Sequence, residues 1–185
     1  FAPNAEVTME CNPGTAEHGR FENYLNAGVN RLSFGIQSFN DECLKTLGRI
    51  HDSNEAEAAV KMAQDAGYKN INLDLMFALP GQDIAMARDD VERAMALSPT
   101  HLSYYHLTLE PNTVFAAKPP PNLPDEDAAW SLQEQGQAIG LPGAASSSLV
   151  TMKVSATSIA CAPTVGISSA IPIMKIIMCA IQAAM

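Results

Sequence analysis

Polar side chains recur at the ends of short β-like segments, and they are the residues of this sequence best placed to do chemistry. Glu10 ends the first segment, Gln37 ends the second, Asp74 lies in the third, and Thr108 and Glu110 follow the fourth. Their carboxylates, amide and hydroxyl supply hydrogen-bond acceptors and donors for a small polar ligand. If the segments are parallel strands of one barrel, these groups face its mouth, where the active sites of such barrels lie.

Asp74 is the most informative of these residues because Leu73 and Leu75 flank it. An acid inside an apolar strand must find a hydrogen-bond donor, or burial raises its pKa. The plainer alternative, for this residue and for the other polar residues taken singly, is a side chain that caps a neighbouring loop.

Strands and helices are predicted to alternate along the first 140 residues. Asn54 to Glu57 have the pattern of a capping box, and Gly28 and Gly67 are suited to end helices. The predicted strands are 6–10, 31–37, 70–77 and 101–107, and the predicted helices are 15–26, a short one capped by Asn40, 54–67, 84–98 and 125–137.

This alternation predicts an α/β protein with parallel strands and right-handed crossovers. Four such units fit either an open doubly wound sheet or part of a barrel. A dinucleotide-binding sheet would carry a glycine-rich turn, Gly-x-Gly-x-x-Gly, after a strand. Because no predicted strand end has that turn, we expect part of a (β/α) barrel.

The composition narrows the classes of function. The formal net charge of −9 argues against a nucleic-acid surface, which would be basic. Cys11, Cys43, Cys161 and Cys179 are too widely spaced to form a paired metal motif, and no disulfide framework is indicated. A reducing cytoplasm is therefore the expected location. The chain begins with Phe1 and shows no signal peptide, which favours a truncated start.

Residues 139–185 form a low-charge tail that differs from the rest of the chain. Beyond residue 140 the only charged side chains are Lys153 and Lys175, and aromatic residues are absent. Three interpretations stay open: a membrane helix within 165–185, which Lys175 and Pro172 would interrupt, an apolar linker, or a segment that is not in the natural reading frame. We assign no function to this tail.

Five short strings occur in a fixed order: MECNPG at 9–14, NRLSFGIQSF at 30–39, LGRIH at 47–51, NLDLM at 72–76 with LPG at 79–81, and LTLEPNT at 107–113. Each string alone is weak evidence for a protein family, but five strings in the same order and register are specific evidence. Together they resemble the oxygen-independent coproporphyrinogen III oxidase-like family of radical S-adenosylmethionine (SAM) proteins. The resemblance covers residues 1–138, about three-quarters of the chain.

The resemblance implies a partial radical SAM barrel of the (β/α)6 type over residues 1–138, with the N-terminal units missing. In this family a Cys-x3-Cys-x2-Cys loop after the first strand holds a [4Fe–4S] cluster, and that loop would lie upstream of Phe1. SAM chelates the open iron of the cluster and is held along the strand ends. Because SAM carries a sulfonium, an ammonium and a carboxylate, its pocket needs groups of both signs.

By position, the resemblance assigns five residues to SAM. Glu10 matches a carboxylate near the ribose or amino-acid part, and Asp74 matches a second acid that faces SAM. Gln37 and Arg49 match polar contacts, and the Arg49 guanidinium is suited to pair with the SAM carboxylate. Thr108 matches a position near the adenine. For Arg49 the plainer alternative is a surface salt bridge, which would contribute little.

One position departs from the family pattern. Relatives often have glycine where this chain has Ala78, just before Leu79 and Pro80. A β-carbon at this position would crowd the barrel mouth or change the turn.

The family contains two functional classes. In one, a 5′-deoxyadenosyl radical starts the decarboxylation of coproporphyrinogen III to protoporphyrinogen IX. The other is a heme chaperone that delivers heme to membrane hemoproteins. The strings at 12–14, 48–51 and 109–113 resemble the chaperone class, which we favour for the parent protein, with coproporphyrinogen oxidation as the alternative. A third alternative is that this chain is inactive because it lacks the cluster loop.

His51 and His106 are weak candidates for heme ligands, because a lone histidine is more often a structural hydrogen-bonding residue. The heme-associated His-Asn motif of the chaperone class would follow the barrel. Residues 141–185 contain no such motif, which weakens the case for heme binding by this chain itself.

Overall fold

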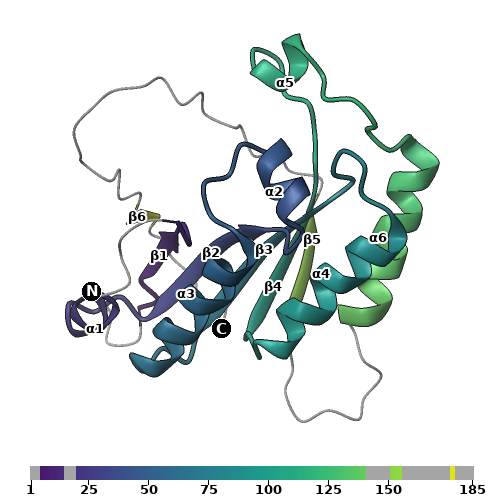
Figure 1. Cartoon of the computed structure of the whole chain (residues 1–185). Coiled ribbons are helices and arrows are strands. Elements are labelled where there is room, and N and C mark those ends of the chain that lie inside the picture. The colour runs from purple at the N-terminus through teal and green to yellow at the C-terminus, as the bar shows by residue number, and fades with distance from the viewer. Residues whose placement is uncertain (1–4, 15–19, 141–150, 156–175, 178–185) are drawn as a thin grey trace, which may run out of the picture.

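One sheet of six strands forms the centre of the structure, a computed structural model that describes residues 5–14, 20–140, 151–155 and 176–177 (Figure 1). The strands are β1 (Thr8–Cys11), β2 (Arg31–Gln37), β3 (Ile71–Phe77), β4 (His101–His106), β5 (Thr151–Ser155) and β6 (Ile176–Ile177). Their order across the sheet is β5-β4-β3-β2-β1-β6. Neighbours from β1 to β5 are parallel, and β6 runs antiparallel to β1.

Helices connect the parallel strands. They are α1 (Phe21–Asn26), α2 (Asp41–Thr46), α3 (Ser53–Asp65), α4 (Ile84–Ala96), α5 (Val114–Ala117) and α6 (Glu126–Gly140). In Figure 1, α3, α4 and α6 lie against one face of the sheet, and α6 packs beside α4. The predicted α/β fold with parallel strands is therefore confirmed over β1 to β4.

The two faces of the sheet differ because side chains alternate along each strand. In β3, Leu73 and Leu75 are fully buried on the face that the helices cover. Asn72, Asp74 and Met76 alternate with them and therefore lie on the opposite face. The strand register places polar side chains of β1, β2 and β4 on this second face as well: Thr8, Glu10, Arg31, Ser33, His101, Ser103 and Tyr105.

Most predicted boundaries agree with the structure to within a few residues, and β2 agrees fully. The first strand starts at Thr8 rather than Glu6. Of the predicted helix 15–26, the structure describes the part from residue 20 onward, where α1 begins at Phe21. The short helix α5 was not predicted, because its 4 residues are too few to show a helical periodicity.

The capping box was predicted two residues too late. The N-cap of α3 is Asp52, whose carboxylate accepts from the Glu55 N–H while Glu55 accepts from the Asp52 N–H. Asp52 has the extended backbone that a cap requires, with ψ 176°, whereas Asn54 is already helical. The predicted caps at Asn40 and Gly67 are confirmed, because Asn40 accepts from the Cys43 N–H and Gly67 has φ +100°.

The tail contributes a strand at each edge of the sheet, β5 beside β4 and β6 beside β1. Most of the segment 165–185, for which a membrane helix was one interpretation, lies outside the described residues. Within the part that the structure describes, no helix is long and apolar enough to cross a membrane. The helix α6 runs to Gly140, slightly beyond the expected domain limit at residue 138, and that limit stays a prediction.

Candidate functional site

The pairing of β2 is irregular at its carboxyl end, where Gln37 lies. Phe34 pairs with Leu73, but Gln37 pairs with Leu75, so β2 has one extra residue at this point. Such a bulge re-aims the side chains around it. Gln37 has φ 70°, in the left-handed region, and its side chain is buried. Its Oε1 has no hydrogen-bond partner among the described residues, which leaves a buried acceptor for a ligand atom that donates.

Gly35 makes room for this side chain. A β-carbon at position 35 would come 3.0 Å from Gln37 Nε2, closer than ordinary van der Waals contact allows. Gly35 follows Ser33 by two residues and so belongs to the polar face of β2. The Gln37 amide therefore leans over the polar face of the sheet rather than into the helix-covered core.

Asp74 has the donors that its position in an apolar strand requires. Ser33 Oγ donates to Asp74 Oδ2 at 2.8 Å, and Asn72 Nδ2 donates to Asp74 Oδ1 at 2.9 Å. Asn72 also accepts from Ser103 Oγ at 3.0 Å. The expectation that this acid would find a donor is confirmed, and the donors come from β2 and β3.

Glu10 lies on the same polar face as Asp74, near the carboxyl end of β1, and is exposed. A residue that was not predicted, Tyr105, is paired with Met76 in the register of β3 and β4, and Met76 lines the depression described below. Burial raises the pKa of Tyr105, the hydrogen bond with Ser103 lowers it, and the negative charges of Asp74 and Glu10 raise it further. Strand alternation could have found Tyr105, because it is two residues from Ser103 on β4.

Arg49 and Thr108, which are far apart in the sequence, line one open depression at the carboxyl ends of the strands. The depression encloses about 420 Å³ of space that includes open solvent. Gly48, with φ 70°, ends α2, and the Arg49 N–H then donates to Leu44 O at 2.9 Å. The lining residues are Leu47, Arg49, Met76, Leu107, Thr108, Glu110, Thr113 and Phe115.

This lining combines a cation, an acid, two hydroxyls and an apolar floor. Thr108 Oγ1 donates to Glu110 Oε1 at 3.3 Å. Met76 lies two residues beyond Asp74 on the polar face of β3, so the depression continues from the polar face of the sheet. The structure thus groups Arg49 and Thr108 directly, and it places Asp74 and Glu10 on the adjoining polar face.

Both histidines have structural contacts. His51 is buried, and its Nε2 donates to Ile36 O at 3.1 Å, while its Nδ1 has no partner among the described residues. Burial lowers the pKa of His51, and the nearby Arg49 charge lowers it further. The His106 ring stacks on Phe77 with 5.3 Å between ring centroids, and burial lowers its pKa as well.

Ala78 occupies a turn that suits glycine better. It is buried and has φ 59°, in the left-handed region where a β-carbon is strained. Ala78 thus adopts the left-handed conformation that favours glycine, and the expected crowding of the barrel mouth or change of the turn stays a prediction. The strain lies at the strand end next to Gln37, which is also left-handed.

We use the word rim for the carboxyl-end side chains of Glu10, Gln37, Arg49, Asp74 and Thr108. A SAM molecule would find suitable groups there. Carboxylates on the polar face match its ammonium and hydroxyl groups, Arg49 matches its carboxylate, and the unpartnered Oε1 of Gln37 matches any donor. No group of three or more metal-ligating side chains capable of holding an ion occurs in the described ranges of the chain. The structure assigns no cluster ligand to these residues.

Comparison with known families identifies the class of this protein. The family model of the radical SAM superfamily matches residues 1–94, and the chain belongs to that superfamily. The chain is 53% identical over 139 residues to the protein named heme chaperone HemW of Haemophilus influenzae, and equally to that of Escherichia coli. Each match covers 75% of this chain and 36% of the relative, so the chain spans about a third of the length of these relatives.

Solved structures show the same fold. The coproporphyrinogen III oxidase HemN of Escherichia coli, described as a radical SAM enzyme, matches with a TM-score of 0.66 and 28% identity over 73% of this chain and 32% of its own. The archaeal Elp3 protein of Methanocaldococcus infernus matches with a TM-score of 0.67 and 19% identity over 80% of this chain and 35% of its own. These matches confirm the partial radical SAM barrel.

Proposed function

We propose that this chain forms the SAM-binding rim of a radical SAM heme chaperone. The observation that carries the proposal is the 53% identity with two proteins named heme chaperone. The proposal includes heme as the cargo, membrane hemoproteins as its recipients and a cytoplasmic location for the protein.

Each rim residue has a role in this proposal that follows from its chemistry. Arg49 pairs with the SAM carboxylate through its forked donors. Glu10 and Asp74 accept from the ammonium group and the ribose hydroxyls. Thr108 and the apolar floor of the depression hold the adenine, and Gln37 Oε1 accepts one further hydrogen bond. A [4Fe–4S] cluster, when bound, supplies the electron for reductive cleavage of SAM.

Calorimetric titration of SAM into anaerobically reconstituted full-length protein tests the rim. Arg49→Ala and Asp74→Asn should each weaken SAM binding by about tenfold or more, because each removes a charge-assisted interaction worth roughly 1.5–3 kcal/mol. Arg88→Ala is the matched control, since Arg88 is half exposed on α4 and its ion pair with Glu92 lies at the surface. Unchanged SAM affinity in both rim variants would contradict the site.

A second candidate, oxidation of coproporphyrinogen III, is favoured by the likeness to HemN at 28% identity. The two functions separate when reconstituted protein is incubated with coproporphyrinogen III, SAM and a reductant. We expect heme to bind stoichiometrically and no protoporphyrinogen to form. Formation of protoporphyrinogen would replace the chaperone proposal by the oxidase.

A further inference from the structure

A buried carboxylate lies beneath the rim and plays no part in the site described above. Asp90, on α4, is 1% exposed and is the only acid among the buried residues that the structure describes. It accepts hydrogen bonds from Ser38 Oγ at 2.9 and 3.0 Å, from the Phe39 N–H, and from Gln82 Nε2 at 3.2 Å. These donors, and not a cation, satisfy its oxygens.

The donors belong to the two turns that follow β2 and β3. Ser38 and Phe39 come directly after Gln37. Gln82 lies in the turn after β3, and its Oε1 accepts from the Leu79 N–H at 3.2 Å. One side chain of α4 thus binds the chain at the carboxyl ends of two neighbouring strands, which we call the strand exits. It bonds directly to the residues after β2, and it reaches the turn after β3 through Gln82.

Both exits contain a non-glycine residue in the left-handed region. Gln37 has φ 70° and Ala78 has φ 59°. Such conformations are unfavourable by about 1–3 kcal/mol and persist only where the surroundings enforce them. The hydrogen bonds to Asp90 start one residue after each of them, at Ser38 and, by way of Gln82, at Leu79.

Asp90 is also unfavourable for the stability of the fold. Burial raises its pKa to about 6, because its hydrogen bonds do not fully replace the lost hydration. A well-packed apolar residue would avoid this penalty at neutral pH. A carboxylate here is therefore better explained by what it holds in place than by net stability.

We propose that Asp90 is a positioning residue that fixes both strand exits and thereby aims the Gln37 amide at the ligand on the rim. The role at the ligand rests on the proposed SAM site, whereas the anchoring of the two turns does not. The unpartnered Oε1 of Gln37, on a buried side chain, is the second observation that points to a ligand at this place.

Hydrogen exchange measured by mass spectrometry on the full-length protein tests the anchoring. In Asp90→Asn the new amide nitrogen faces Gln82 Nε2, so two donors oppose each other. Backbone exchange in peptides that cover 37–41 and 78–82 should become about tenfold faster, while exchange in α3 stays unchanged. Asp89→Asn is the matched control, because Asp89 is the preceding acid on α4 and is exposed.

Adding Gln82→Glu to Asp90→Asn should restore slow exchange. In the double variant the amide introduced at position 90 donates to one oxygen of the carboxylate introduced at position 82. The other oxygen of that carboxylate still accepts from the Leu79 N–H, so the original pattern returns with the charge moved from one side chain to the other. Because the double variant keeps the packing, it tests the anchoring of the two turns even if Asp90→Asn alone folds poorly. Exchange that stays fast in the double variant, or that never rises in the single one, would overturn the anchoring.

A double-mutant cycle then tests the effect on the ligand. Asp90→Asn should weaken SAM binding about tenfold in the wild-type background, but less than about twofold in a Gln37→Ala background, because it acts through Gln37. Equal losses in both backgrounds would show that Asp90 does not act through Gln37. Wild-type protein that binds no SAM would instead contradict the proposed function, and the exchange measurements would still decide the anchoring.

Discussion

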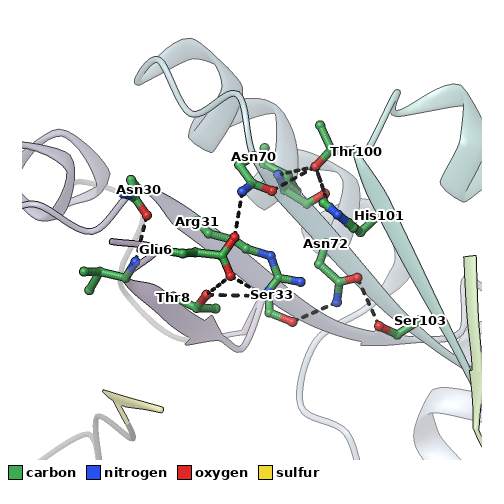
Figure 2. A network of polar contacts seen from close by, with 12 residues as sticks. Glu6, Thr8, Asn30, Arg31, Ser33, Asn70, Asn72, Thr100, His101 and Ser103 are labelled. Atoms are coloured by element: carbon green, nitrogen blue, oxygen red, sulfur yellow. Dashed lines mark hydrogen bonds and ion pairs between the residues drawn. The ribbon is translucent and has the colours of Figure 1, made fainter. Parts of the chain in front are cut away.

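The polar face of the sheet has two ends that differ in how their side chains are satisfied. At the amino ends of the strands, side chains bond one another in the network of Figure 2. Glu6 accepts from Asn70 at 3.2 Å and from Thr8 at 3.3 Å, and it faces Arg31 at 3.9 Å. Thr100 continues the network by donating to Asn70 at 3.1 Å.

At the carboxyl ends of the same strands, the hydrogen bonding of the side chains is less complete. Gln37 Oε1 and His51 Nδ1 are buried acceptors without a partner among the described residues. Two non-glycine residues there, Gln37 and Ala78, have left-handed backbones, and a depression opens beside Arg49. This difference agrees with the proposal that the ligand binds at the carboxyl ends, where the active sites of such barrels lie.

Removing the centre of the network should have the largest effect. Asn72 is buried and bonds Ser33, Asp74 and Ser103. Asn72→Ala should lower the free energy of unfolding by about 3–4 kcal/mol, because it leaves several buried polar groups without partners. Urea denaturation measures the change, with the exposed Asn54→Ala as the control. A loss below about 1 kcal/mol would mean that the network contributes little.

The titration of Asp90 should make the stability of the fold depend on pH. The pKa of Asp90 is raised from 3.8 to about 6, so its contribution to stability is present below pH 3.8 and is lost as the pH rises through 6. The stability of wild type relative to Asp90→Asn should therefore fall by about 2–3 kcal/mol between about pH 3.5 and pH 7. Thermal or urea unfolding at several pH values measures this difference. A difference that does not change with pH would contradict the raised pKa.

A conservative change on the rim should affect the ligand more than the fold. Arg49→Lys keeps the charge but loses the forked donors, so SAM affinity should fall about tenfold. Calorimetry measures the affinity, and Arg88→Lys on the surface of α4 is the matched control. Equal affinity of the two variants would place SAM away from the depression.

Crowding the Gln37 side chain should have a smaller effect. Gly35→Ala adds a β-carbon 3.0 Å from Gln37 Nε2, and the amide must shift by a few tenths of an ångström. SAM affinity should fall about threefold to fivefold, with less than about 1 kcal/mol change in unfolding free energy. In a Gln37→Ala background the effect on SAM should vanish, and its persistence would show that Gly35 acts by another route.

Relief of strain after β3 should give the smallest change. Ala78→Gly removes the β-carbon from a left-handed residue and should raise the free energy of unfolding by about 0.5 kcal/mol, since the greater freedom of unfolded glycine offsets part of the gain. Ala58→Gly, on the exposed side of α3, should instead destabilise by about 1 kcal/mol. If Ala78→Gly and Ala58→Gly lowered the free energy of unfolding by similar amounts, position 78 would not be strained.

The sequence predicted the elements well because periodicity and caps are local signals. The polar residue at each strand end was also predictable, since alternation and turn residues mark where a strand stops. The bulge at Gln37 was not, because it depends on the pairing of β2 with Leu73 and Leu75 across the sheet. Bulges of this kind have no reliable local pattern when no glycine occupies the left-handed position.

Asp90 escaped notice although a signal was present. Ala87, Val91 and Ala94 recur at helical spacing and lie on the buried face of α4, and Asp90 lies three residues after Ala87 on that same face. An acid on an apolar helix face needs donors from elsewhere in the fold, and those donors are known only once the turns after β2 and β3 are placed. Tertiary contacts, not local propensity, determine its role.

The order of β1 to β4 across the sheet is also their order along the chain. Each of β2, β3 and β4 pairs with the strand synthesised just before it, after a connection of one or two helices. Loop closure for each pairing therefore involves a few tens of residues rather than the whole chain. The sheet can grow by one unit at a time as the chain leaves the ribosome, with the rim completed by the last strand to join.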